Sequence, residues 1–421
     1  MPPDFNNLSG PIPVEIGLLT TLRDINMNTN SLVGDIPVQV CELRELRTLG
    51  LSSNMMDGSI HECLGNLVNL NLLLLSNNEF SGPLPTTFAN LQNLSYMFID
   101  NNGLSGDVID IVDQMGNLRE LYADDNQFAG TMTDQTFAYS NLLRQVNLSK
   151  NQIGGSFPTA LFTQPFLRVV DLHDNLLSGP LPATFPENSN LLFLSLHQNS
   201  FRGPIPGTIG NVPNLYHLDL HSNQLTGSIN TLGGLLHLKY LFVNDNPFDE
   251  GPIPESFQWF LELQELSVAG TNRTGSIPTF LGSMKEFQTL DLANNRFSGV
   301  IPASLGSLPK LQYLLLNGNP NLSGEVPSSF GKLQNLKALT LEETGLEGSL
   351  DPVCGLIAFA RNLEDANRLL TAHCGKVDCP CCTSCCENAC EVSAADVFIP
   401  AWEALSPPVA DSRFAGKAHS G

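Results

Sequence analysis

Apolar and polar residues follow one fixed order that returns every 23 to 25 residues along most of the chain. The order is clearest in Leu191–Pro206, which reads LLFLSLHQNSFRGPIP, with apolar residues at positions 1, 4, 6 and 11 and asparagine at position 9. The Leu-x-Leu run predicts a short strand. Leu194 and Leu196 should point inward and Ser195 and His197 outward, because side chains alternate along a strand. Repetition of the unit predicts parallel strands side by side on one face.

Fourteen copies of this unit can be aligned, and no interval between them falls outside 23 to 25 residues. They open at Leu22, Leu46, Leu70, Leu94, Leu118, Leu143, Leu167, Leu191, Leu215, Leu238, Leu263, Phe287, Leu311 and Leu336. A period of this length with this spacing of leucine and asparagine indicates a leucine-rich-repeat solenoid. The predicted fold is therefore an α/β solenoid with about 14 full repeats. We expect a partial N-terminal repeat at residues 1–21 and the solenoid at residues 22–350.

The remaining positions of the unit each have a structural reading. Asn199 follows the strand, where its side chain can bond backbone groups of its own coil and of the next. Gly203 permits the bend after the strand. Ile205 and Pro206 predict a second extended run, since the residue before proline avoids the helical region. In the repeat that opens at Leu263, Arg273 occupies an inward leucine position. We expect its side chain to reach outward to solvent, and a local break in the solenoid is the alternative.

The end of the unit, L-x-G-x-(I/L)-P, appears in Leu32–Pro37 and Phe297–Pro302. It resembles the plant-specific leucine-rich-repeat subfamily, which includes receptor-kinase ectodomains and polygalacturonase-inhibiting proteins. The resemblance covers about Asn6 to Leu350. It implies a right-handed superhelix with a concave parallel β-sheet and an extracellular binding role.

The net charge and the first residues of the chain restrict the expected partners and cellular location of the protein. A net charge of −22 argues against binding to nucleic acid or to anionic membranes. No run of 18 apolar residues is present, so no membrane span is expected in this chain. The first residues lack a signal peptide, and Asn6–Pro13 reads as the back half of a repeat. We therefore expect a fragment of a longer secreted or membrane-anchored protein, located outside the cell or at its surface. The alternative is a genuine N-terminus that packs as a cap.

Ten cysteines are expected to form disulfides. They are Cys41, Cys63, Cys354, Cys374, Cys379, Cys381, Cys382, Cys385, Cys386 and Cys390. The last eight define a predicted cap at residues 351–390, which resembles the cysteine cap of secreted diatom and algal leucine-rich-repeat proteins. Within it we expect a helix over Gly355–Ala366 and a strand over Leu369–Cys374. The spacing of Cys379, Cys382 and Cys385 also fits zinc, an alternative that stays open. Residues 391–421 read as a disordered tail.

Five Asn-x-Ser/Thr sequons are candidate glycosylation sites. Asn147 falls on the predicted strand face and is the least suited to carry a glycan. The predicted glycosylation sites are therefore Asn7, Asn93, Asn272 and Asn321.

No sequence motif indicates catalysis or a cofactor, and we assign no metal site. His173, His197 and His221 should lie on consecutive strands near Asp171 and Asp219, so a metal or pH-sensitive patch stays an alternative to merely polar outward positions. The notable pattern lies at the outward strand positions of the fifth to eleventh coils, where aromatic and titratable residues gather. The predicted ligand-binding residues of the concave face are Tyr96, Phe98, Tyr122, His173, Phe193, His197, His217, His221, Tyr240 and Phe242. Exposed aromatics indicate an interface, whereas lateral packing between neighbours is the structural alternative. The histidines predict an affinity that changes between about pH 5 and 7.

These observations predict a non-catalytic extracellular recognition module that binds a peptide, protein or glycan on its concave sheet. A structural or adhesive cell-wall protein and an inhibitor of a secreted hydrolase are the alternatives. The ligand itself is not encoded in any recognisable motif.

Overall fold

The structure, a computed structural model, describes residues 7–187, 189–356, 369–372, 376–382 and 384–385. The chain divides into two compact units. The first contains residues up to 182 together with 189–201, and the second contains residues 183–188 together with those from 202 onward. Among the described residues, none of the helices has the length and apolar content needed to span a bilayer.

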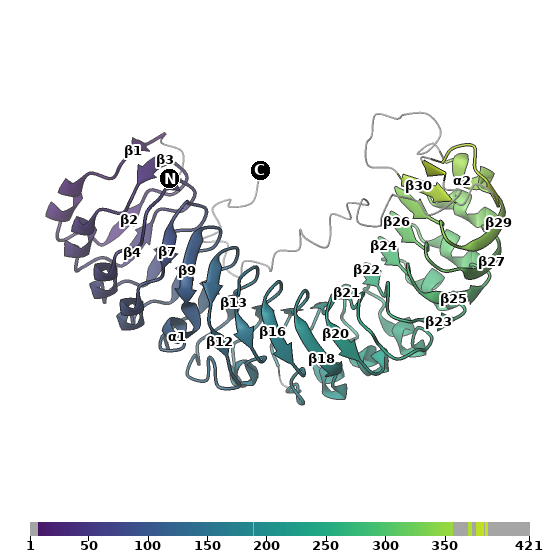
Figure 1. Cartoon of the computed structure of the whole chain (residues 1–421), viewed down its shortest axis with the longest axis horizontal. Helices are drawn as coiled ribbons and strands as arrows, with labels where there is room; N and C mark the ends of the chain where they lie inside the picture. The colour runs from purple at the N-terminus through teal and green to yellow at the C-terminus, as the bar shows by residue number, and fades with distance from the viewer. Residues whose placement is uncertain (1–6, 188, 357–368, 373–375, 383, 386–421) are drawn as a thin grey trace. The chain divides into compact units, whose positions relative to one another are not determined.

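In the first unit, each repeat contributes one three-residue strand to a parallel sheet, and neighbouring strands come from consecutive repeats (Figure 1). The register is constant, because Ile25 pairs with Leu49 and Leu49 with Leu73. The middle residue of every strand points into the coil, as the alternation predicts. The strands are β2 (Asp24–Asn26), β4 (Thr48–Gly50), β6 (Leu72–Leu74), β8 (Tyr96–Phe98), β10 (Glu120–Tyr122), β13 (Gln145–Asn147), β15 (Val169–Asp171) and β17 (Phe193–Ser195).

The second unit is built in the same way, and its sheet continues past the last repeat. β28 pairs with β30, and β30 pairs with β32, both of which lie within the predicted cap. The strands are β19 (His217–Asp219), β21 (Tyr240–Phe242), β22 (Glu265–Ser267), β24 (Thr289–Asp291), β26 (Tyr313–Leu315), β28 (Ala338–Thr340), β30 (Leu369–Ala372) and β32 (Ser384–Cys385). The predicted solenoid architecture with a parallel sheet is confirmed in each unit.

A second set of short strands forms where each repeat reads Leu-x-Gly. In β18 (Ser200–Pro204), Gly203 has φ +81°, a conformation that disfavours other residues. The other strands of this set are β1 (Ser9–Gly10), β3 (Ser31–Gly34), β5 (Met55–Met56), β7 (Ser81–Pro83), β9 (Gly103–Asp107), β11 (Gln127–Ala129), β12 (Thr131–Met132), β14 (Gly154–Gly155), β16 (Leu176–Gly179), β20 (Gln224–Thr226), β23 (Thr274–Gly275), β25 (Arg296–Gly299), β27 (Asn321–Glu325), β29 (Gly345–Ser349) and β31 (Val377–Asp378).

The prediction for Ile205 and Pro206 is only partly correct. Pro206 is extended (φ −64°, ψ 138°), but a 3-10 helix begins at the next residue. Proline suits this place because it has no N–H to leave unpaired at a helix start. The 3-10 helices are η1 (Val14–Leu18), η2 (Val38–Glu42), η3 (Glu62–Asn66), η4 (Thr86–Asn90), η5 (Thr159–Thr163), η6 (Gly207–Asn211), η7 (Ile229–Gly234), η8 (Glu255–Trp259), η9 (Thr279–Ser283), η10 (Ala303–Ser307) and η11 (Ser328–Lys332). One repeat has a short α-helix in this place, α1 (Val108–Val112).

The asparagine at position 9 connects adjacent coils as predicted. Asn199 Nδ2 donates to the carbonyls of Leu196 (3.2 Å) and His197 (3.1 Å) in its own coil, and to Leu172 (3.0 Å) in the preceding one. Its Oδ1 accepts from the N–H of Leu177 at 2.9 Å. One side chain therefore satisfies four backbone groups that no strand ladder reaches.

Arg273 corrects a sequence prediction. Its side chain is buried rather than turned to solvent, with only 3% of its surface exposed. The guanidinium finds backbone acceptors inside the coil: Nε donates to the carbonyl of Thr271 at 2.9 Å, and Nη2 donates to that of Asp249. Burial lowers the pKa of the guanidinium, and the nearby Asp249 carboxylate opposes this. Carbonyls left open in this irregular coil explain why the charge is held inside.

The described part of the cap contains a helix, three strands and two disulfides. The helix α2 (Asp351–Cys354) starts before the predicted one, and Gly355 ends it rather than opening it. Residues 357–366 of the predicted helix lie outside the described residues, as do Cys374, Cys386, Cys390 and the tail 391–421. The predicted strand begins at Leu369, in β30, and is described to Ala372.

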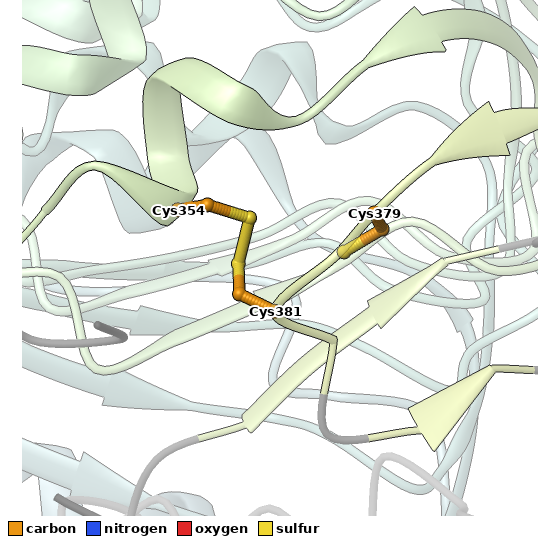
Figure 2. A group of neighbouring side chains, drawn as sticks. All are labelled: Cys354, Cys379 and Cys381. Carbon is orange, nitrogen blue, oxygen red and sulfur yellow. A yellow bond between two sulfur atoms is a disulfide. The ribbon is translucent and has the colours of Figure 1, made fainter. Parts of the chain in front are cut away.

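Cysteine pairing is visible in both parts of the chain. Cys41 is joined to Cys63 in the neighbouring coil. In the cap, Cys354 is bonded to Cys381 and Cys379 to Cys382. Figure 2 shows Cys354, Cys379 and Cys381 gathered at the end of α2. Zinc would require these sulfurs as thiolates, whereas disulfide sulfurs bind it poorly.

We predict that non-reducing peptide mapping of protein secreted by a eukaryotic host yields these three cross-links, with metal analysis showing no stoichiometric zinc. Each bond should stabilise its region by roughly 2–4 kcal/mol by restricting the unfolded chain. Protein treated with a reductant is the control for cross-link assignment. Free thiols at Cys354 or Cys379, or one zinc per chain, would contradict the prediction.

Candidate binding face

The outward-pointing residues of the parallel strands and of the turns just after them form one face in each unit, called here the strand face. In the first unit, Phe98 of β8 stacks on Tyr122 of β10, with ring centroids 5.0 Å apart and planes within 8°. The hydroxyl of Tyr122 donates to Oε1 of Gln145 on the next strand. Burial, followed by the nearby carboxylate of Glu120, raises the pKa of Tyr122. The phenol therefore stays neutral and acts as a hydrogen-bond donor.

Carboxylates accompany these aromatics. Asp124 follows β10, and burial raises the pKa of its carboxyl well above the ordinary range, with the negative charges of Asp100 and Asp171 adding to the effect. Among the described residues, Oδ1 of Asp124 is buried without a hydrogen-bond partner. Asp100 instead accepts from the hydroxyl of Ser76 at 2.5 Å. This part of the face repels anions and offers an acceptor to a donor from a ligand.

Two predicted histidines lie against one another in the first unit. The rings of His173 and His197 stack with centroids 4.1 Å apart and planes within 11°. Nδ1 of His173 is 2.6 Å from Oδ1 of Asp171, and Nδ1 of His197 is 2.9 Å from the hydroxyl of Ser195. The parallel register places both rings at the same position of consecutive coils. Protonation of both rings would put two like charges within one stack.

In the second unit His217 lies among aromatic rings. Its ring centroid is 5.7 Å from that of Tyr240 and 6.0 Å from that of Phe242, both on the adjacent strand β21. His221 follows the same strand as His217, and its Nδ1 lies 2.7 Å from Oδ1 of Asp219. These contacts fix the rings in position along the strand face of this unit.

Further along the second unit, two buried carboxyls form no ion pair with any of the described residues. Glu265 of β22 is 6% exposed and Asp291 of β24 is 2% exposed. Burial raises the pKa of Glu265 to about 7 and that of Asp291 to about 6. Asp291 accepts from the hydroxyl of Ser267 (2.7 Å) and from the N–H of Ala293 (3.1 Å), which limits its shift. Glu265 has no such help, because its Oε2 is buried without a partner among the described residues.

Family comparisons agree with this geometry. The Leucine rich repeat family model matches residues 261–320, and a second Leucine Rich Repeat model matches residues 69–91, 214–235 and 310–333. Over 44 residues, the chain is 52% identical to Receptor-like protein 31 of Arabidopsis thaliana; these are 10% of this chain and 5% of that protein.

Similar solved structures extend the likeness over most of the chain. The plant peptide hormone receptor RGFR1 in complex with RGF2 is 31% identical, with a TM-score of 0.72 over 83% of this chain and 60% of that one. The complex PEPR1-AtPEP1 is 30% identical, with a TM-score of 0.70 over 84% of this chain and 56% of that one. In sequence and fold the chain is similar to these plant leucine-rich-repeat receptors. It spans little more than half the length of these two receptor chains.

The leucine-rich-repeat strand face differs from the predicted one in how much of it is exposed. Six of the predicted ligand-binding side chains are buried, not exposed. They are Tyr122 (8% exposed), Phe193 (3%), His197 (9%), His217 (3%), His221 (9%) and Phe242 (1%). Aromatic rings on strands about 4.8 Å apart contact one another sideways, as Phe98 and Tyr122 do, and so remove surface from water. Tyr96, Phe98, His173 and Tyr240 keep more accessible surface.

The sequons also separate by burial. Asn147 is 6% exposed and accepts hydrogen bonds from both the N–H and the hydroxyl of Ser149, so its amide is unsuited to a bulky glycan. Asn7, Asn93 and Asn321 are exposed, and Asn272 is half-buried. Glycosylation at these four sites stays a prediction.

Sequence reasoning did not select Asp124, Glu265 or Asp291. The available signal was a carboxylate at an outward strand position directly beside an aromatic in the neighbouring coil, as for Glu265 beside Tyr240. The outward positions were read as solvent-exposed, where an acidic residue carries no information. Their burial makes these carboxyls the most unusual groups of the leucine-rich-repeat strand face.

Proposed function

We propose that this plant-type leucine-rich-repeat chain is a non-catalytic extracellular recognition module that binds a peptide or a peptide-like protein segment along the strand face. The main observation behind this proposal is which side chains the strand face contains. The face combines stacked aromatic rings, as at Phe98 and Tyr122, with buried polar atoms that lack partners among the described residues, as at Asp124. Aromatic anchors beside unsatisfied acceptors are typical of surfaces that bind a partner.

Similar receptors support the choice of a peptide. The titles of the RGFR1 and PEPR1 structures name complexes with RGF2 and AtPEP1, and a HAESA structure from Arabidopsis names the peptide hormone IDA and the co-receptor SERK1. The HAESA chain is 29% identical over 87% of this chain, which covers 69% of that one, with a TM-score of 0.70. By analogy, an extended segment would lie across several strands and contact one or two residues from each coil.

A screen of capped decapeptide pools by biolayer interferometry tests the proposal. The tightest binder is then mapped by hydrogen exchange. We expect protection at β8 and β10, and Phe98→Ala should weaken binding about tenfold, since removing one aromatic anchor costs on the order of 1–2 kcal/mol.

Tyr139→Ala is the matched control, because Tyr139 is an aromatic side chain 76% exposed in the loop before β13 and away from the strand face. It should change affinity less than about twofold. The placement is wrong if Phe98→Ala binds normally or if the protected amides lie on η4 and η5. The proposal fails altogether if no pool binds.

The histidine pair adds a pH dependence to the same proposal. His173 already lies against Asp171, so its protonation creates an ion pair, while protonation of the stacked His197 adds a like charge beside it. Affinity for an anionic peptide should therefore rise as pH falls from about 7 to 5. The interferometry assay at both pH values, with His197→Gln as the variant, measures this change.

A further inference from the structure

The second unit contains a buried glutamate, Glu265, with one carboxyl oxygen that has no hydrogen-bond partner among the described residues. Glu265 lies at the first outward position of β22, level with Tyr240 on β21 and Thr289 on β24. Burial raises the pKa of Tyr240 and that of Tyr313, which lies one strand beyond Thr289, and the negative charge of Glu265 adds to both shifts. Both phenols are therefore near the carboxyl. Two aromatic rings therefore flank one buried carboxyl on the strand face.

Among the described residues, no positive charge satisfies that carboxyl. In the part of the chain that the structure describes, neither Glu265 nor Asp291 takes part in an ion pair, and Oε2 of Glu265 is without a hydrogen-bond partner. A buried carboxyl without a partner costs folding free energy, so its presence calls for a compensating group.

The polar groups near Glu265 are also negatively charged or hydrogen-bond acceptors. Asp291 lies diagonally from Glu265 on the next strand. The strand spacing and the rise of two residues together put the two roughly 8 Å apart. Oδ1 of Asn244, a residue 1% exposed just after β21, is a second buried acceptor without a partner, while its Nδ2 donates to Asp245 at 2.8 Å. Asp245 in turn lies close enough to Asp291 to raise the pKa of that carboxyl. All of these groups accept hydrogen bonds or carry negative charge.

The rings beside the carboxyl are suited to a cation. Tyr313 already has the ammonium of Lys337 5.8 Å from its centroid. A cation is stabilised both by the face of a tyrosine ring and by a carboxylate, and more strongly when it is shielded from water. The small residues Ser267 and Ala269 follow Glu265 along the coil, and Ser267 donates its hydroxyl to Asp291 at 2.7 Å.

From these contacts we infer that Glu265, with Asp291 beside it, receives a lysine or arginine side chain of the bound peptide. This inference rests on the proposed function, because it names the class of residue that the peptide inserts. Binding would supply the missing donor to Oε2 of Glu265. The raised pKa of Glu265 is consistent with a carboxyl that ionises fully only when the cation arrives.

Four pools of decapeptides, randomised at the other positions, test the inference by interferometry at pH 7.5. Three are capped, with lysine, norleucine or glutamate fixed at the centre, and the fourth has central norleucine and a free N-terminus. The wild type should bind the lysine pool about tenfold more tightly than the norleucine pool. Glu265→Gln should reduce this difference to less than about twofold.

Glu325→Gln is the matched control, because Glu325 is an exposed acid of β27, outside the main sheet. It should keep the full preference for lysine. Equal binding of the lysine and norleucine pools, or an unchanged preference in Glu265→Gln, overturns this inference and leaves the proposed function standing. A free N-terminus that matches the effect of lysine also overturns it, because the site would then select a terminal ammonium. Failure of all pools to bind overturns both proposals.

Discussion

Asn175→Ala should lower the free energy of unfolding by roughly 3–5 kcal/mol, the largest effect expected of any polar substitution in the first unit. Asn175 Nδ2 donates to the carbonyls of Leu148 (2.9 Å), Leu172 (3.2 Å) and His173 (3.0 Å). Its Oδ1 accepts from the N–H of Ile153 at 3.0 Å. The side chain is 8% exposed, so water replaces few of these bonds, and each unsatisfied buried group costs about 1–3 kcal/mol.

Urea unfolding together with hydrogen exchange of the Ile153 amide measures the effect, because exchange reports the local opening that a solenoid allows. Asn175→Thr should lose less, since Thr271 and Thr344 occupy the same position in other coils and each keeps one bond to its own coil. Asn190→Ala is the control, because the exposed Asn190 makes a single bond, to the carbonyl of Pro165. Equal losses for Asn175→Ala and Asn190→Ala would contradict the assigned role of the asparagine ladder.

The role of this ladder was accessible from sequence because it depends on local chemistry repeated many times. Each coil places an amide side chain at the turn after its strand, where backbone groups are left without partners, and the fixed period brings these turns together. The same reasoning predicted Leu194 and Leu196 as core residues, and both are fully buried. Alternation and period together were enough to predict the sheet of each unit.

The strand face was less predictable, because its burial depends on the sizes of side chains in neighbouring coils. Phe242 is at an outward position and is nevertheless 1% exposed. Glu265 was unremarkable in sequence, but in the structure it is buried and its Oε2 has no hydrogen-bond partner among the described residues. The burial of Arg273 was also not predictable from the sequence. Its side chain points inward because the carbonyls of Thr271 and Asp249 accept its hydrogen bonds in an irregular coil. Pairwise context of this kind is not contained in a single repeat.

Glu265 and Asp291 should make the protein less stable as pH rises from about 4.5 to 7.5. The pKa of Glu265 is about 7 in the folded protein against 4.5 for an ordinary glutamate, and that of Asp291 is about 6 against 3.8. Between these values the folded state binds more protons than the unfolded state, so the free energy of unfolding falls with rising pH. Below about pH 3 both states are protonated and the difference disappears. For each carboxyl the full change is on the order of 3 kcal/mol.

The comparison of wild type with Glu265→Gln isolates one of these contributions, because glutamine is neutral at every pH and close to glutamic acid in shape. The two proteins should be about equally stable at pH 4.5, and the variant should be more stable by up to about 3 kcal/mol at pH 7.5. Urea midpoints at half-unit pH steps give the difference directly. Glu325→Gln should follow the wild type throughout, because Glu325 is exposed and the general repulsion of a chain with net charge −22 is nearly the same in both variants. If the free energies of unfolding of Glu265→Gln and wild type change with pH in the same way, Glu265 ionises normally. The carboxyl would then be adequately solvated, and the physical reason for a cation at this position would be gone.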